Sequence, residues 1–77
     1  MLPIMRPALR HEIAEHRFKV GQAVQYYAPR GIYAPRGEYH VTAELPSRAG
    51  EFEYRIKHPQ EAYERVAAES ALMRDPP

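Results

Sequence analysis

The sequence predicts a single small domain that is built mainly of β-strands. Residues 38–45 and 51–57 alternate apolar and polar side chains, a pattern typical of half-buried strands. Pro46 is expected to end the first of these strands, because proline cannot donate a ladder hydrogen bond. Residues 47–50 then form a hairpin connection, so the two strands should pair antiparallel. With only 77 residues, the chain can build one thin core.

The alternation also predicts which side chains face that core. In the second strand the polar residues should point to solvent, and in both strands the apolar residues should point inward. The predicted outward residues are Glu38, His40, Thr42 and Glu44. The predicted inward residues are Tyr39, Val41, Ala43, Leu45, Phe52, Tyr54 and Ile56, with the tyrosine hydroxyl groups at the rim of the core.

An earlier strand is predicted over residues 18–27, with Val24 and Tyr26 on one face and a bulge or tight entry at Gly21. Residues 1–17 are expected to form a loosely ordered arm with a nascent helical turn after Pro7. Residues 75–77 are expected to be frayed.

A short internal repeat separates the first two strands. The five residues 27–31, Tyr-Ala-Pro-Arg-Gly, recur at residues 33–37. Proline stops a helix and glycine permits a positive φ angle, so this segment is predicted to be a long loop with two turns. Two copies of six residues cannot build a core, so the repeat is not a solenoid.

Two interpretations compete for the C-terminal part of the sequence. Helix propensity favours one helix over residues 59–72. The alternative is a turn at residues 58–60, a strand at 62–67 that brings Val66 to the core, a 3₁₀ turn at 69–71, and a last strand from Leu72.

The order of these segments resembles that of small SH3-like barrels, closest to the Tudor and KOW kinds. The resemblance is carried by residues 21–24, 37–41, 54–57, 64–66 and 69–72. The combination Gly-x-Tyr-x-Val, Leu-Pro, Tyr-Arg-Ile-Lys, Glu-Arg-Val and Glu-Ser-x-Leu is also similar to a family of short bacterial proteins.

That resemblance implies a five-stranded, half-open SH3-like barrel over residues 18–74. It favours the interpretation of the C-terminal part as strand, 3₁₀ turn and strand over the helical one. It implies no assigned activity and transfers no functional residue to this chain.

Composition narrows the possible functions. Eleven basic residues nearly balance ten acidic ones, for a net charge of +1, which argues against a polyanion-coating tail. The absence of cysteine excludes disulfides, thiolate nucleophiles and Cys-based zinc sites. No apolar run reaches the roughly 18 residues of a membrane span, and the first residues do not resemble a signal peptide. A cytoplasmic location is therefore expected.

No catalytic or metal-binding constellation is evident. His11 and His16 are five residues apart, whereas the zincin pattern needs histidines at i and i+4 on one helix face. His40 and His58 are expected to be exposed surface residues. Ser47 and Ser70 do not lie in a Gly-x-Ser-x-Gly elbow. We therefore expect no enzyme activity, no cofactor and no metal.

The loop of residues 27–37 is the strongest candidate for a functional site. It carries two arginines and no acidic residue, and arginine beside aromatic rings suits protein surfaces as well as phosphate and base stacking. A solvated loop without a ligand is the third possibility. We predict a non-enzymatic protein-interaction module, with weak RNA or DNA binding through the same loop as the alternative; neither a membrane nor a small-molecule ligand is inferred. The candidate binding residues are Tyr27, Arg30, Tyr33, Arg36 and Tyr63.

Overall fold

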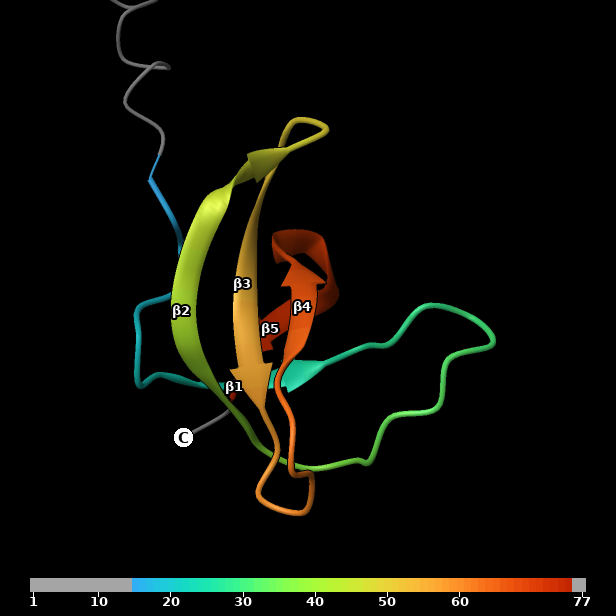
Figure 1. The fold of residues 1–77 in the computed structure, drawn as a ribbon. Helices are drawn as coiled ribbons and strands as arrows, with labels where there is room; N and C mark the ends of the chain where they lie inside the picture. The colour runs from blue at the N-terminus through green and yellow to red at the C-terminus, as the bar shows by residue number, and fades with distance from the viewer. Residues whose placement is uncertain (1–14, 76–77) are drawn as a thin grey trace, which may run out of the picture.

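In the computed structural model of the chain, residues 15–75 are described, and they form one antiparallel sheet of five strands (Figure 1). The strands lie in the order β4-β3-β2-β1-β5. A 3₁₀ turn, η1, separates β4 from β5, and no α-helix occurs within the described residues. The elements are β1 (Ala23–Tyr26), β2 (Tyr39–Arg48), β3 (Glu51–Lys57), β4 (Arg65–Ala68), η1 (Glu69–Ala71) and β5 (Leu72–Arg74).

The prediction of a mainly β domain is confirmed, and the helical interpretation of residues 59–72 is wrong. The segment is divided among β4, η1 and β5 because its backbone pairs with two different strands. Strand β4 pairs with β3, and β5 pairs with β1. Tertiary pairing therefore overrides the helix propensity of these residues.

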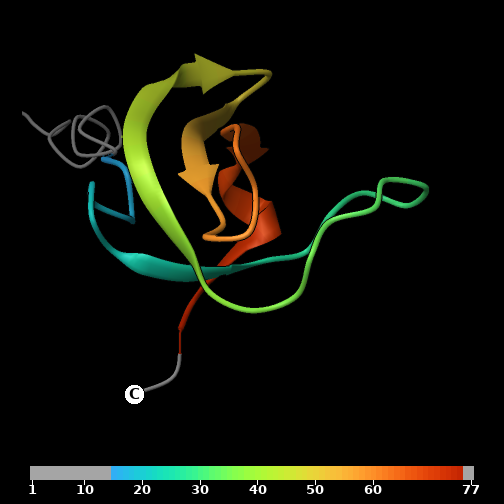
Figure 2. The same cartoon turned by 60° about the horizontal axis from the view of Figure 1, so that its bottom comes forward.

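Strand β2 is long and strongly curved (Figures 1 and 2). Its pairing with β3 shifts register between Val41 and Ala43 and again between Leu45 and Arg48. Such bulges bend a strand and increase its twist. The prediction that Pro46 ends this strand is wrong, because the strand continues to Arg48 and the proline lies within the second register shift, where a ladder hydrogen bond is not required.

The first register shift also corrects the predicted core. Beyond it, Ala43 lies opposite Arg55 and Leu45 lies opposite Glu53. Directly opposed residues in an antiparallel pair share a face, so Ala43 and Leu45 lie on the side of these charged partners. Both are half-buried and neither belongs to the core.

The core is small and largely aromatic. It contains Phe18, Val24, Tyr39, Val41, Tyr54, Ile56, Ala67 and Leu72, with Tyr26 and Phe52 packed against it. Phe18 is buried although it precedes β1, which is shorter than the predicted strand. Val66 was expected to reach the core, but it pairs with Arg55 and is half exposed. Its neighbour Ala67 pairs with Tyr54 and is buried instead.

The segment before Phe18 packs against the sheet from His16 onward. Nε2 of His16 donates a hydrogen bond to the carbonyl oxygen of Leu45, 2.6 Å away, and its ring stacks on that of Phe52 with centroids 4.1 Å apart. These contacts fall within the predicted arm of residues 1–17. The predicted helical turn after Pro7 lies outside the described residues. Of the predicted frayed end at residues 75–77, Asp75 is described and accepts a hydrogen bond from Gln25, and residues 76–77 lie outside the described range.

Two polar contacts tie η1 to the core. The hydroxyl of Tyr54 donates to the Glu69 carboxylate and accepts from the backbone N–H of Phe18. The backbone N–H of Arg17 donates to the same carboxylate. Burial, and then the hydrogen bond to Glu69, raise the pKa of Tyr54 to about 12. The phenol therefore stays protonated and joins three segments of the chain.

Candidate interaction surface

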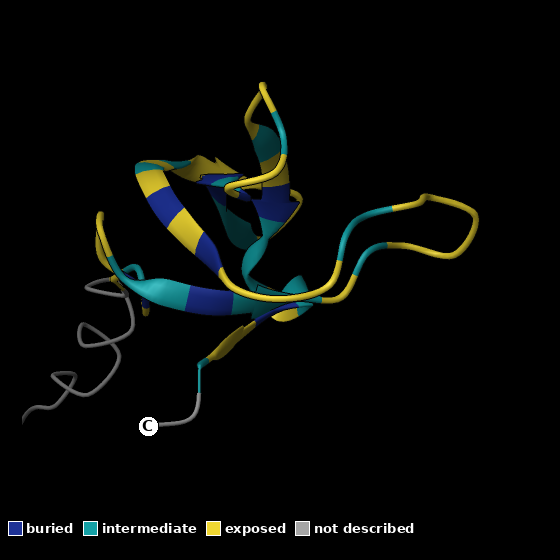
Figure 3. Ribbon diagram, turned by 90° about the horizontal axis from the view of Figure 1, so that it is seen from below, coloured by how far each residue is buried: buried dark blue, intermediate teal, exposed yellow. Residues whose placement is uncertain are grey.

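The repeat forms a loop that projects from the sheet between β1 and β2 (Figures 1 and 2). In its first copy, the N–H of Ile32 donates to the carbonyl oxygen of Pro29 at 3.0 Å, which closes a tight turn. Gly31 in this turn has φ +87°, a value suited to glycine. The tip of the loop, including Arg30, is exposed to solvent (Figure 3).

The second copy of the repeat is anchored to the core. The hydroxyl of Tyr39 donates to the carbonyl oxygen of Pro35 at 2.7 Å. Nδ1 of His58 accepts a hydrogen bond from the N–H of Gln60, so the ring proton is on Nε2, which donates to the carbonyl oxygen of Arg36 at 2.8 Å. The prediction that His58 is exposed is wrong: it is 5% exposed, because its ring packs edge-on against Tyr39 under the loop. His40 is exposed, as predicted.

A guanidinium group joins the loop to the segment between β3 and β4. Arg65 donates through Nε and Nη2 to the two carboxylate oxygens of Glu61, at 2.9 and 2.6 Å, and through Nη2 to the carbonyl oxygen of Tyr33, at 3.2 Å. These bonds lower the pKa of Glu61 and raise that of Arg65. The guanidinium carbon also lies 5.6 Å from the centroid of the Tyr63 ring. Arg65 therefore positions the middle of the loop.

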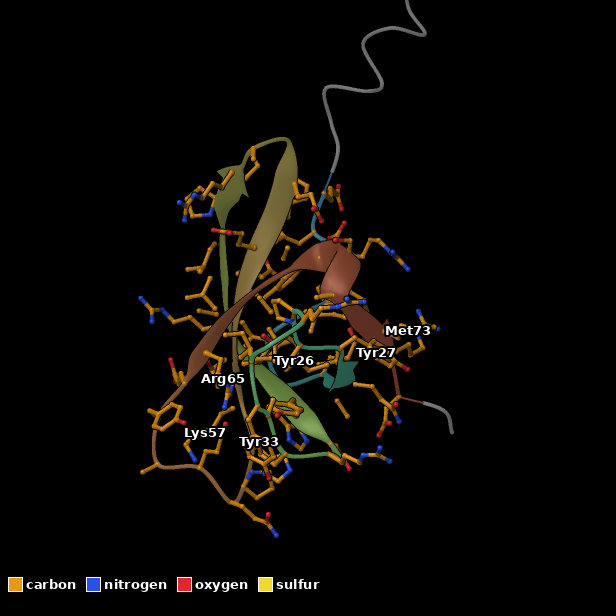
Figure 4. All side chains as sticks on the ribbon, turned by 90° about the vertical axis from the view of Figure 1, so that its right-hand side faces the viewer. Tyr26, Tyr27, Tyr33, Lys57, Arg65 and Met73 are labelled. Atoms are coloured by element: carbon orange, nitrogen blue, oxygen red, sulfur yellow. The ribbon has the colours of Figure 1, made fainter. Side chains whose placement is uncertain are left out.

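The five predicted binding residues are all exposed, but they do not form one cluster. The exposed fractions of the aromatic ones are 56% for Tyr27, 82% for Tyr33 and 59% for Tyr63. Tyr33 and Tyr63 are brought near each other through Arg65, which contacts both. Arg30 lies apart from them at the turn. In Figure 4, Tyr27 lies at the base of the loop and Tyr33 on its opposite side.

A pocket of about 450 Å³ lies at the base of the loop, between its two ends. The residues that line it include an arginine, a glutamine and two tyrosines. One of these, Tyr26, packs edge-on against Tyr39, with ring centroids 5.4 Å apart. The lining residues are Gln25, Tyr26, Tyr27, Ala28, Arg36 and Gly37.

The charge of the loop is not compensated locally. Among residues 15–75, the ion pairs involve His16, His40 and Arg65, and neither Arg30 nor Arg36. Arg65 has its charge matched by Glu61, whereas the two arginines of the repeat have no acidic partner. A positively charged surface with exposed aromatic rings follows.

Other kinds of site receive no support from the described residues. Within residues 15–75, no three His, Cys, Asp or Glu side chains lie close enough to hold a metal ion. His11, which the sequence paired with His16, lies outside this range. No helix in the same part of the chain is long and apolar enough to cross a membrane.

Sequence reasoning missed the residues that hold the loop in place. His58 resembled a solvent-exposed turn residue because it precedes Pro59. Glu61 and Arg65 are four residues apart, a spacing visible in the sequence but associated there with a helix surface. Gln25 and Tyr26 of the pocket carried no signal beyond their position at the end of a strand.

Comparisons of the chain with protein-family models, with curated proteins and with solved structures give no match.

Proposed function

We propose that the protein is a cytoplasmic, non-enzymatic interaction module of the SH3-like barrel type, which contacts another protein through the loop of residues 27–37. The architecture is supported by the strand order and by the curvature of β2, which pairs with β1 near one end and with β3 along the rest of its length. The short η1 turn between β4 and β5 is the further feature expected of such barrels.

The observation that carries the proposed function is the exposure of large apolar side chains on an anchored loop. Tyr33 is 82% exposed and Ile32 is 52% exposed. Arg65 holds the backbone carbonyl of Tyr33, and His58 holds that of Arg36 farther along the loop. Exposed aromatic residues and arginine are enriched in protein interfaces. A loop that is already positioned loses less conformational entropy when it binds.

Nucleic acid is the second candidate, favoured by Arg30 and Arg36, which form no ion pair within residues 15–75. Arginine and tyrosine can contact phosphate and stack on bases. However, the net charge is only +1, because ten acidic residues nearly balance the eleven basic ones. Binding driven by phosphate contacts would be weak and would fall steeply with salt. A protein partner can contact the apolar as well as the charged residues of the loop. A protein partner therefore explains more of the exposed residues than a nucleic acid does.

A pull-down with a charge-reversed loop tests the proposal. The wild type is compared with the double variant Arg30→Glu plus Arg36→Glu and with the control Arg48→Glu plus Arg55→Glu. The control makes the same change of charge at two exposed arginines on β2 and β3. We expect the loop variant to lose specific partners that the control retains.

Recovery of the same partners by all three baits would contradict the proposal. A titration with mixed RNA and DNA oligonucleotides, at low and high salt, separates the second candidate. Binding at low salt that disappears in the loop variant would favour nucleic acid over protein.

A further inference from the structure

We infer that the pocket between the two ends of the loop binds an acidic side chain of a peptide segment, held next to an apolar residue, with Arg36 as the anion-binding group. This inference rests on the proposed function and names the chemistry of the partner. It follows from the charge, the shape and the rigidity of the pocket.

The charge of the pocket favours an anion. Arg36 is exposed and has no ion-pair partner among residues 15–75, and no acidic residue occurs in the loop. The acidic side chain that contacts a lining residue is Asp75, whose carboxylate accepts a hydrogen bond from Nε2 of Gln25 at 3.0 Å. This bond occupies an amide rather than the guanidinium. A carboxylate, like a phosphate, is a partner that a guanidinium binds with two parallel hydrogen bonds, and the carboxylate is the anion that a peptide segment carries.

The walls of the pocket favour an apolar neighbour for that acid. Tyr26 and Tyr27 are among the residues that line it, and the small residues Ala28 and Gly37 complete the lining on either side of the loop. Met73, half exposed on β5, extends the apolar surface beside Tyr27 (Figure 4). A volume of about 450 Å³ holds one or two side chains, and peptide ligands are commonly recognised by such small, partly apolar pockets.

Both walls are fixed before any ligand arrives. On the first wall, the N–H of Tyr27 donates to the carbonyl oxygen of Ala71 at 2.9 Å. On the second wall, the backbone of Arg36 is held by His58, and Gly37 packs close to the same imidazole. A preformed pocket is the kind that gives a small ligand useful affinity, because little ordering is needed on binding.

The internal repeat supplies a matched control. Arg30 and Arg36 have the same local sequence, Ala-Pro-Arg-Gly, but only Arg36 lines the pocket. Arg36→Gln and Arg30→Gln therefore remove the same charge from the same loop. Neither change alters a backbone hydrogen bond, since His58 contacts the carbonyl oxygen of Arg36.

The experiment selects peptides from a random phage-displayed library with the wild type and with each variant. We expect the wild type and Arg30→Gln to enrich peptides that carry aspartate or glutamate beside an apolar residue, and Arg36→Gln to lose that enrichment. A synthetic peptide of the enriched sequence should bind Arg36→Gln at least about tenfold more weakly than the wild type, and Arg30→Gln within about twofold. The same peptide with its acidic residue replaced by the corresponding amide, glutamine or asparagine, should bind the wild type about as weakly.

Enrichment without acidic residues, equal loss in the two variants, or no enrichment at all would overturn the inference. So would an Arg36-dependent binding of oligonucleotides in place of peptides. The two proposals fail separately. If the charge-reversed loop loses protein partners but no acidic peptide is selected, the loop is the contact and only the acidic-peptide specificity is wrong. Backbone amide shifts of Gly37, with Gly31 as the control, report occupancy of the pocket directly.

Discussion

The imidazole Nε2 of His58 donates a hydrogen bond to the carbonyl oxygen of Arg36 across 2.8 Å, between the end of β3 and the second copy of the repeat. The first copy is bound to the sheet at its first residue, where the N–H of Tyr27 donates to the carbonyl oxygen of Ala71, whereas a Cβ added at Gly31 in its turn would have no atom within 4 Å. Identical pentapeptides therefore serve different purposes. The arginine and glycine of the first copy lie in the exposed turn, and those of the second copy lie where the loop returns to the core.

Replacing His58 should destabilise the domain and release the base of the loop. His58→Ala leaves the carbonyl oxygen of Arg36 and the N–H of Gln60 without their partner and opens a space beside Tyr39. We expect a loss of about 2 kcal/mol in the free energy of unfolding, measured by urea denaturation. Amide hydrogen exchange at Gly37 should become faster.

His40→Ala is the control for this change, because His40 is exposed and its Nε2 lies 3.1 Å from a carboxylate oxygen of the exposed Glu38. Its effect on the free energy of unfolding should stay within about 0.5 kcal/mol. Equal effects of the two substitutions would show that His58 does not anchor the loop.

The contact between Tyr54 and Glu69 predicts a loss of stability at high pH. The unfolded Tyr54 loses its proton near 10.0, whereas the folded one keeps it to about 12. The unfolded state therefore binds fewer protons in this range, and the free energy of unfolding falls as the pH rises from about 10 toward 12. Urea denaturation of the wild type and Tyr54→Phe across this range measures the effect.

Tyr54→Phe should remove that part of the pH dependence and also reduce stability at neutral pH by about 1–3 kcal/mol. The N–H of Phe18 then loses its partner, and the Glu69 carboxylate loses one of its two donors. Tyr33→Phe, at an exposed ring, should leave the profile unchanged. Parallel pH profiles for the wild type and Tyr54→Phe would refute the assignment.

Most of the sheet could be predicted from alternation alone, because side-chain direction in a strand has a period of two. The errors lie where pairing departs from that period. No local sequence pattern indicates the register shift after Val41, so the alternation placed Ala43 and Leu45 in the predicted core. The exposure of Val66 has a similar cause, since the pairing of β4 with β3 sets its face.

The candidate loop could also be predicted, because proline, glycine and repetition are local signals. The residues that hold the loop in place could not be predicted. The contacts of His58 with Arg36 and of Arg65 with Tyr33 join residues 22 and 32 positions apart. The pocket needs the ends of the loop to approach each other on a folded sheet, a condition that no segment encodes alone.

The hairpin between β2 and β3 carries local strain that can be relieved. Ala49 and Gly50 form a two-residue turn between the paired residues Arg48 and Glu51, with φ angles of 54° and 84°. The predicted connection of residues 47–50 is thus tighter than expected. A positive φ at both central residues is typical of a type I′ turn, in which asparagine before glycine is preferred and alanine is strained.

Ala49→Asn should therefore raise the free energy of unfolding by about 0.5–1 kcal/mol, measured by thermal and urea denaturation. Ser47→Asn, at an exposed strand position, should bring no such gain. A neutral or destabilising Ala49→Asn would mean that the turn does not adopt this geometry in solution.

The two glycines of the repeat should differ in their response to alanine. Gly31 has φ +87° and open space where a Cβ would be added. Gly31→Ala should therefore cost about 1 kcal/mol, from backbone conformation alone. Gly37 has φ +111°, farther from the left-handed region open to other residues, and its added Cβ would lie 3.4 Å from Nε2 of His58.

Gly37→Ala should cost about 2 kcal/mol or more, because the backbone must change where His58 holds Arg36. Urea denaturation of the two variants measures the difference between their free energies of unfolding. Because the two glycines follow the same four residues, local sequence does not contribute to this difference. If the loop is instead mobile along its whole length, both alanines relax freely and the two costs converge. If the loss of stability caused by Gly37→Ala disappears in a His58→Ala background, the strain lies at the contact between His58 and the loop.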